Sequence, residues 1–169
     1  GSEMCIRDSY KTMHNPEVDW CYKTEPDETM ANRSIPYPRG KTLGGSSSIN
    51  GLLYIRGQEQ DYNIWRQLGN KGWGWNDVLP YFLKSENQER GQSNYHGVGG
   101  PLSVADQRIK LSILDAFMNA AEEVGIPKVN DFNKGDNFGC GYFQVTEKNG
   151  LRCSAAVGYL LSLIHISEP

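Results

Sequence analysis

The sequence has little of what several functional classes require. It contains 3 His and 4 Cys in 169 residues, with no C-x-x-C pair and no His spaced as metal partners. No apolar run approaches the length that spans a bilayer, and no Lys/Arg-led apolar segment opens the chain as a secretory signal. The net charge of -3 does not favour nucleic acid as a partner. We therefore expect no metal site, no transmembrane segment and no nucleic-acid partner.

What the chain does contain is glycine and an ordinary globular balance of residues. Hydrophobic residues make up 38% and charged residues 22%, and the 19 glycines gather in candidate loops. This composition is typical of a soluble globular protein with long, shaped connections. The internal cysteines, Cys21, Cys140 and Cys153, read as scattered thiols, although a disulfide between two of them stays open.

The two ends of the chain are related through DNA. Residues 161–169, LSLIHISEP, can be encoded by CTGTCTCTTATACACATCTCCGAGCC. The reverse complement of that DNA, read from GGC, encodes GSEMCIRD and begins a serine codon, which matches residues 1–9. We interpret residues 1–9 and 161–169 as a non-native, adapter-derived sequence. Residues 10–160 are then expected to be an internal fragment of a longer protein.

Hydrophobic spacing predicts several helices. They are expected over Gln58–Leu68, over DVLPYFLKSE behind Asn76 with Pro80 in the first turn, and over Lys110–Val124. A short buried helix is predicted over Ile49–Ile55, with one of the preceding serines as N-cap. The apolar face predicted for the Lys110–Val124 helix comprises Leu111, Leu114, Phe117, Met118, Ala121 and Val124.

The remaining segments read as turns and short strands. Asp19–Glu25 is expected to be extended, while Met30–Pro38 and Gly91–Pro101 read as loops. Tyr142–Thr146 and Leu151–Cys153 are predicted to form a hairpin around a type I′ turn at Asn149-Gly150. Ser154 is a candidate cap for a last helix, AAVGYL. No strand–GxGxxG–helix unit is present, so a complete dinucleotide-binding unit is not expected in this chain.

The stretch RGKTLGGSSSING, residues 39–51, suggests an anion-binding loop. Its Gly-Lys-Thr resembles the end of a nucleoside-triphosphate loop, but such a loop needs an earlier glycine where Ile35 stands. Pro36 and Pro38 also lack the N–H groups that would face phosphates. The alternative is that Gly44-Gly45 lets the backbone approach a ligand, with a helix start supplying N–H groups. A plain Gly/Ser turn without a ligand is the third interpretation.

A longer pattern separates these interpretations. PRGKTLGGSSSINGLLYIRG, DYNIWRQLGNKGWGWNDVLPYFLKSE, YHGVGGPL and NGLRCSAAVGYL occur in this order. Together they resemble the glucose–methanol–choline (GMC) flavoprotein oxidoreductases, especially choline- and alcohol-dehydrogenase-like members. The resemblance covers nearly all of residues 10–160. It implies an α/β fold class, α+β within this fragment: part of a GMC FAD-binding domain with short helices, Gly-rich loops and a hairpin, without the N-terminal Rossmann βαβ.

The resemblance also implies a cofactor and a reaction. Family members bind FAD and oxidise alcohols, passing a hydride from carbon to flavin N5 while a base takes the hydroxyl proton. The residues implied to contact FAD are Thr42, Gly44, Gly45, Ser46, Asn50, Gly51, Leu52 and Leu53. Some choline-oxidising relatives carry a flavin-linked His where Ile49 stands, so non-covalent FAD is expected here. The implied partners are a choline-like or other primary alcohol and an electron acceptor, either oxygen or a quinone-type carrier.

The catalytic residues of the family are not found in this chain. The His and its His/Asn partner that do the acid–base work lie in a C-terminal part, so no catalytic residue is assigned and the fragment by itself is expected to be inactive. A non-enzymatic relative that uses the fold for binding or assembly is the alternative. His96 is interpreted as a structural residue of its loop, because no orienting group is apparent. Trp65, Trp73, Trp75, Tyr81 and Phe82 are interpreted as packing residues.

Overall fold

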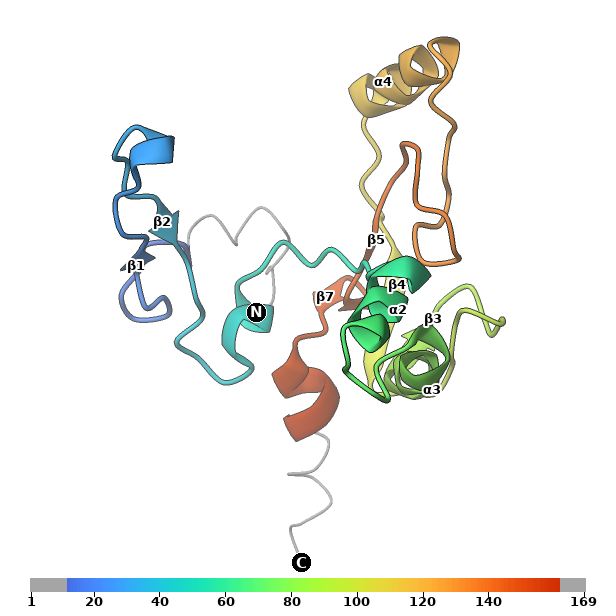
Figure 1. The fold of residues 1–169 in the computed structure, drawn as a ribbon, viewed down its shortest axis with the longest axis horizontal. Coiled ribbons are helices and arrows are strands. Elements are labelled where there is room, and N and C mark those ends of the chain that lie inside the picture. The colour runs from blue at the N-terminus through green and yellow to red at the C-terminus, as the bar shows by residue number, and fades with distance from the viewer. Residues whose placement is uncertain (1–11, 162–169) are drawn as a thin grey trace, which may run out of the picture. The chain divides into compact units, whose positions relative to one another are not determined.

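The computed structural model describes residues 12–161. The chain divides into two compact units, Gly1–Leu52 with Lys148–Pro169, and Leu53–Glu147, and each is described by itself. Short helices and small sheets separated by long loops make up the described residues (Figure 1), so the mixed α/β character is confirmed. Of the two segments interpreted as adapter-derived, residues 1–9 and 162–169 lie outside the described residues.

A two-stranded ribbon opens the first unit. β1 (Tyr22–Lys23) pairs antiparallel with β2 (Pro36–Tyr37), and a 3-10 turn, Glu28–Met30, lies between them. The extended prediction for Asp19–Glu25 is thus confirmed at Tyr22–Lys23, while Cys21, with a φ of 53°, is not extended. The loop prediction for Met30–Pro38 misses β2, which Pro36 can enter because an edge strand leaves one side of its backbone unpaired.

The hairpin near the end of the chain has the predicted turn but shorter strands. β6 (Glu147–Lys148) pairs with β7 (Leu151–Arg152) around Asn149 and Gly150, whose φ values of 54° and 78° are those of a type I′ turn. The chain then enters a π-helical segment, Ala156–Leu160. Ser154 Oγ accepts a hydrogen bond from Val157 N at 3.3 Å, as the capping prediction requires.

The helix predicted over Ile49–Ile55 is absent, and that prediction is wrong. The helical turn lies earlier, as a 3-10 helix over Gly45–Ser48. Asn50 Oδ1 accepts a hydrogen bond from Leu52 N at 3.1 Å, and Leu52 has a φ of 66°. This local side-chain turn replaces the helical hydrogen bonds and sends the chain onward in an extended conformation.

A small mixed sheet forms the core of the second unit. β3 (Glu86–Gln88) runs parallel to β4 (Leu102–Asp106), which pairs antiparallel with β5 (Gln144–Val145). Val104 and Val145 are almost fully buried. The sequence predicts that Gln144–Val145 pairs with Leu151–Cys153 in the hairpin. In the structure, Gln144–Val145 pairs with β4, which lies far away in the chain.

Two helices precede this sheet, and α2 (Glu59–Gln67) matches its prediction. α3 (Trp75–Ser85) begins earlier than expected, because Asp77 Oδ2 accepts from Gly74 N at 3.0 Å and caps the helix there. Pro80 therefore lies in the second turn of α3, which corrects its predicted place in the first. The aromatic rings between the helices pack as expected, since the ring centroid of Tyr62 lies 5.7 Å from that of Trp75 and 5.8 Å from that of Phe82. Trp65, Trp73 and Tyr81 are nevertheless exposed.

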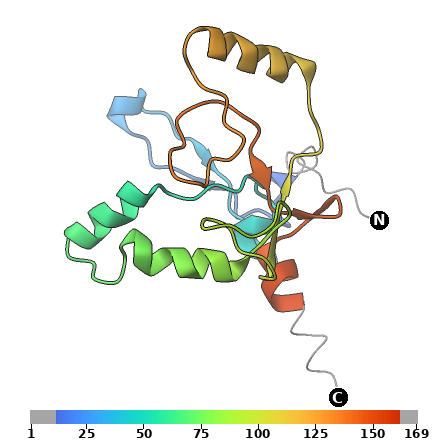
Figure 2. The same cartoon turned by 90° about the vertical axis from the view of Figure 1, so that its right-hand side faces the viewer.

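The third long helix, α4 (Ser112–Glu123), is also confirmed, and Gly125 with a φ of 88° follows its end. Figures 1 and 2 show α4 standing apart from the three-stranded sheet of its unit. Of its predicted apolar face, only Ala121 is buried, while Phe117 is 65% exposed. None of the helices in the described part of the chain combines the length and apolar character needed to cross a membrane.

Candidate functional site

The residues of the predicted FAD loop form a closely folded turn. A Cβ at Gly40 would lie 2.2 Å from Gly45 O, so the two limbs of the loop touch backbone to backbone. Gly45 N donates to Thr42 O at 2.8 Å, and Gly44 and Gly45 both have positive φ. The glycines therefore have a conformational reason to be where they are.

The three serines build this loop. Ser46 Oγ accepts from Gly40 N at 3.2 Å, which links the two limbs. Ser48 Oγ donates to Leu43 O at 2.8 Å, and Ser47 Oγ donates to Gly44 O at 2.5 Å. Ser47 Oγ also accepts from Ala155 N at 2.9 Å, which ties the loop to the start of the last helix.

Arg152, the last residue of β7, holds this loop from outside, and the sequence interpretation missed it. This buried side chain donates through Nη1 to Asn50 Oδ1 at 2.8 Å and to Ser47 O at 3.1 Å. Burial lowers the pKa of the guanidinium from its ordinary value. Asn50 is one of the residues expected to contact FAD. Its Oδ1 therefore already accepts two hydrogen bonds, one from Leu52 N and one from Arg152 Nη1. Only the pairing of distant segments reveals this contact.

Thr42 has a feature that suits a ligand. Its hydroxyl oxygen is buried and has no hydrogen-bond partner among residues 12–161. Around Gly45 and Gly51, by contrast, a Cβ would meet no other atom within 4 Å. A buried hydroxyl that lacks a partner is costly to keep. The loop therefore combines an unsatisfied polar atom with glycine backbone open to close approach, which fits a polar cofactor such as FAD.

The predicted cofactor residues fall in two parts of the structure. Thr42, Gly44, Gly45, Ser46, Asn50, Gly51 and Leu52 belong to the first unit, and Leu53 is the first residue of the second. Ile49 and Leu52 are buried, and Leu53 is exposed. Within the described ranges, no three His, Cys, Asp or Glu side chains are grouped as a metal site, and the three described cysteines are free.

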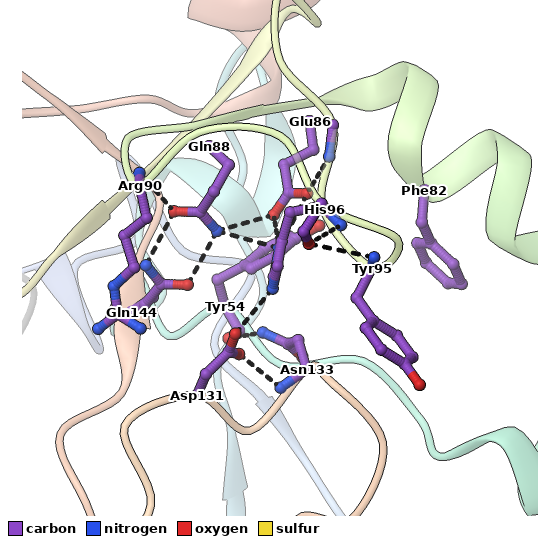
Figure 3. A network of polar contacts seen from close by, with 12 residues as sticks. Tyr54, Phe82, Glu86, Gln88, Arg90, Tyr95, His96, Asp131, Asn133 and Gln144 are labelled. Carbon is purple, nitrogen blue, oxygen red and sulfur yellow. Dashed lines mark hydrogen bonds and ion pairs between the residues drawn. The ribbon is translucent and has the colours of Figure 1, made fainter.

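The second unit contains a buried polar network that sequence reasoning did not find (Figure 3). Glu86, fully buried at the start of β3, receives Arg56 Nη2 at 2.8 Å and Gly97 N at 2.9 Å. Gln88 and Gln144 exchange two amide hydrogen bonds of 2.9 Å beside it. These groups come from separate segments of the chain, so no local spacing in the sequence predicts the network.

His96 lies at the centre of this network. Its Nδ1 is 3.1 Å from Glu86 Oε1 and its Nε2 is 2.8 Å from Asp131 Oδ2. The interpretation of His96 as structural is consistent with these bonds. The expectation that no group orients its ring is wrong, because Glu86 and Asp131 both do so. The hydrogen bond to Asp131, followed by that to Glu86, raises the pKa of His96 to about 9 against the effect of burial. The ring is therefore an imidazolium near neutral pH and no general base.

The proton on His96 makes the stability of the chain depend on pH. Its folded-state pKa of about 9 lies above the ordinary 6.5, so its contribution is complete below pH 6.5 and is lost as the pH rises through 9. We expect urea unfolding to show the free energy of unfolding falling by on the order of 3 kcal/mol across this window. The same fall in a His96→Gln variant would contradict this assignment.

Comparison with known proteins identifies the family. A family model described as GMC oxidoreductase matches residues 4–166. The chain therefore belongs to the GMC oxidoreductase family, whose members bind FAD. It is 41% identical over 152 residues to an alcohol dehydrogenase [acceptor] of Pseudomonas putida, covering 89% of this chain and 28% of that protein.

Other relatives agree with this assignment. An oxygen-dependent choline dehydrogenase of Sinorhizobium fredii is 42% identical, over 84% of this chain and 26% of that protein. The crystal structure of pyridoxine 4-oxidase from Mesorbium loti is 30% identical and matches with a TM-score of 0.86, over 94% of this chain and 31% of that one. The chain thus spans about a quarter of the length of these curated relatives. It is homologous to alcohol and choline dehydrogenases, which are enzymes.

Proposed function

We propose that this chain is the part of an FAD-dependent oxidoreductase that holds one side of the cofactor, and that the complete protein oxidises the CH–OH group of an alcohol. The observation that carries the proposal is the unpartnered buried hydroxyl of Thr42 in a loop with open glycine backbone. The family membership and the alcohol- and choline-oxidising relatives support it. The substrate is a choline-like or other primary alcohol, and the electron acceptor is oxygen or a quinone-type carrier.

The residues proposed to hold FAD are Thr42, Gly44, Gly45, Ser46, Asn50, Gly51, Leu52 and Leu53. FAD, when bound, supplies the acceptor for the hydride of the alcohol carbon. The chain supplies positioning, because the serine hydroxyls and Arg152 hold the loop in one shape before a ligand arrives. Binding is non-covalent at Ile49, whose buried side chain contains only carbon and hydrogen.

The proposal is tested by grafting. Residues 12–160 replace the aligned segment of the Pseudomonas putida alcohol dehydrogenase, to which the chain is 41% identical. We expect the purified graft to carry FAD, seen as flavin absorbance that is released on denaturation, and to reduce a dye when a primary alcohol is added. The isolated 169-residue chain is expected to purify without stoichiometric flavin. A folded graft without flavin would refute the proposed role of the loop.

Thr42→Val distinguishes a ligand contact from a structural role. Valine has nearly the shape of threonine and lacks the buried hydroxyl that has no partner among residues 12–161. We expect the free energy of unfolding of the chain to rise by about 1 kcal/mol, while the FAD affinity of the graft falls about tenfold. Thr42→Ser keeps the hydroxyl and serves as the control, with FAD affinity near that of the wild type. Unchanged affinity in Thr42→Val would remove Thr42 from the cofactor site.

A further inference from the structure

The extended segment Leu53–Arg56 is held by side chains of the polar network. Asn133 Oδ1 accepts from Arg56 N at 2.8 Å, and Asn133 Nδ2 donates to Tyr54 O at 3.2 Å. Tyr54 N donates to Gln144 O at 2.9 Å, and the Gln144 side chain is part of the network. The backbone of Tyr54 and Arg56 is therefore fixed by residues that lie far away in the chain.

The side chains of this segment alternate between two faces, as in any strand. Arg56 is buried and reaches three groups: Glu86 Oε2, Tyr95 O and the Tyr54 hydroxyl. Leu53 and Ile55 point the other way and are 52% and 48% exposed. The network thus holds the Arg56 side of the segment in the interior. The opposite side, formed by Leu53 and Ile55, is left exposed.

We propose that the ionic network around His96 positions Leu53 for cofactor binding. Asn133 and Arg56 clamp the segment, and the His96 ring, held between Glu86 and Asp131, anchors the clamp. In this proposal, Arg56, Glu86, His96, Asp131 and Asn133 are positioning residues that act through Leu53. This inference rests on the proposed function only in naming what Leu53 contacts. The clamp is a statement about the chain without ligand.

The charges around His96 explain why its proton matters. Glu86 faces the ring from β3 and Asp131 faces it from the loop after α4, while Arg56 neutralises Glu86 from the clamped segment. Arg90 lies beside the loop, where its Nη1 donates to Asn130 O at 2.7 Å. With His96 protonated, Arg56 and His96 balance Glu86 and Asp131. Without that proton, Asp131 lacks its buried cation, and the contact that anchors the loop carrying Asn133 two residues later is weakened.

The clamp is tested by NMR on the ¹⁵N-labelled 169-residue chain. We expect the backbone amide signals of Tyr54 and Arg56 to shift with the same pH midpoint as the His96 ring, and His96→Gln to abolish this step. Asn133→Ala is expected to accelerate hydrogen exchange of the same two amides by at least about tenfold, with exposed Asn130→Ala as the matched control. Amides that ignore the His96 titration, or that stay protected in Asn133→Ala, would overturn the clamp.

The graft separates the clamp from the proposed function. We expect Asn133→Ala to weaken FAD binding of the graft, as Thr42→Val does. If Thr42→Val weakens binding and Asn133→Ala does not, the positioning inference fails while the proposed function stands. If the unsubstituted graft binds no FAD but the amides titrate with His96, the proposed function fails while the clamp itself stands.

Discussion

Glu86→Gln is expected to lower the free energy of unfolding of the chain by about 3–5 kcal/mol at neutral pH. Glu86 is fully buried, and its carboxylate lies within hydrogen-bond distance of Arg56, His96, Gln88 and the backbone of Gly97. Its neutral analogue keeps the shape and removes the charge. Two buried cations then face only Asp131, and an unpaired buried charge is among the costliest defects that a single substitution creates.

Urea unfolding followed by tryptophan fluorescence measures this loss, because Trp65, Trp73 and Trp75 belong to the same unit as Glu86. Glu123→Gln, an exposed residue of α4, is the matched control and should change the free energy by less than about 0.5 kcal/mol. The double variant Arg56→Met, Glu86→Leu is expected to recover part of the loss, because it removes both charges together. A loss below about 1 kcal/mol in Glu86→Gln would mean that water reaches the network.

Elements set by interactions between neighbouring residues could be predicted from the sequence, and elements that depend on competing or distant contacts could not. α2 and α4 were predictable because apolar spacing and the glycines after them are local, and so was the Asn149-Gly150 turn. The helix expected at Ile49–Ile55 failed because one side chain, Asn50, forms a turn that competes with it. Apolar content alone cannot rank these two outcomes.

The candidate site divides in the same way. The glycine and serine loop could be recognised from its own residues, but the partners that hold it, such as Arg152, come from about a hundred positions later. The residues next to His96 in the sequence offer its ring no orienting group, whereas Asp131 and Glu86 reach it from 35 and 10 positions away. A parallel pairing of β3 with β4 and the loop after α4 bring these carboxylates to the ring. No spacing in the sequence encodes such contacts.

Gly40→Ala is expected to have the second large effect, in the loop itself. The new methyl carbon would lie 2.2 Å from Gly45 O, 2.4 Å from Gly45 C and 2.8 Å from Ser46 N, all of them backbone atoms. Backbone on both sides cannot give way as a flexible side chain could, so the limbs must separate and the hydrogen bond from Gly40 N to Ser46 Oγ must break. We expect a loss of about 3 kcal/mol or more in the stability of this unit.

Gly51→Ala is the control for this substitution, because it makes the same chemical change in the same stretch. A Cβ at Gly51 meets nothing within 4 Å and its φ is not positive, so alanine should be neutral or stabilise the chain by about 0.4–1 kcal/mol. Hydrogen exchange followed by mass spectrometry over residues 39–51 should show faster exchange in Gly40→Ala and not in Gly51→Ala. Equal protection in both variants would contradict the close approach of the two limbs. The loop would then lack the preformed shape on which its proposed cofactor role depends.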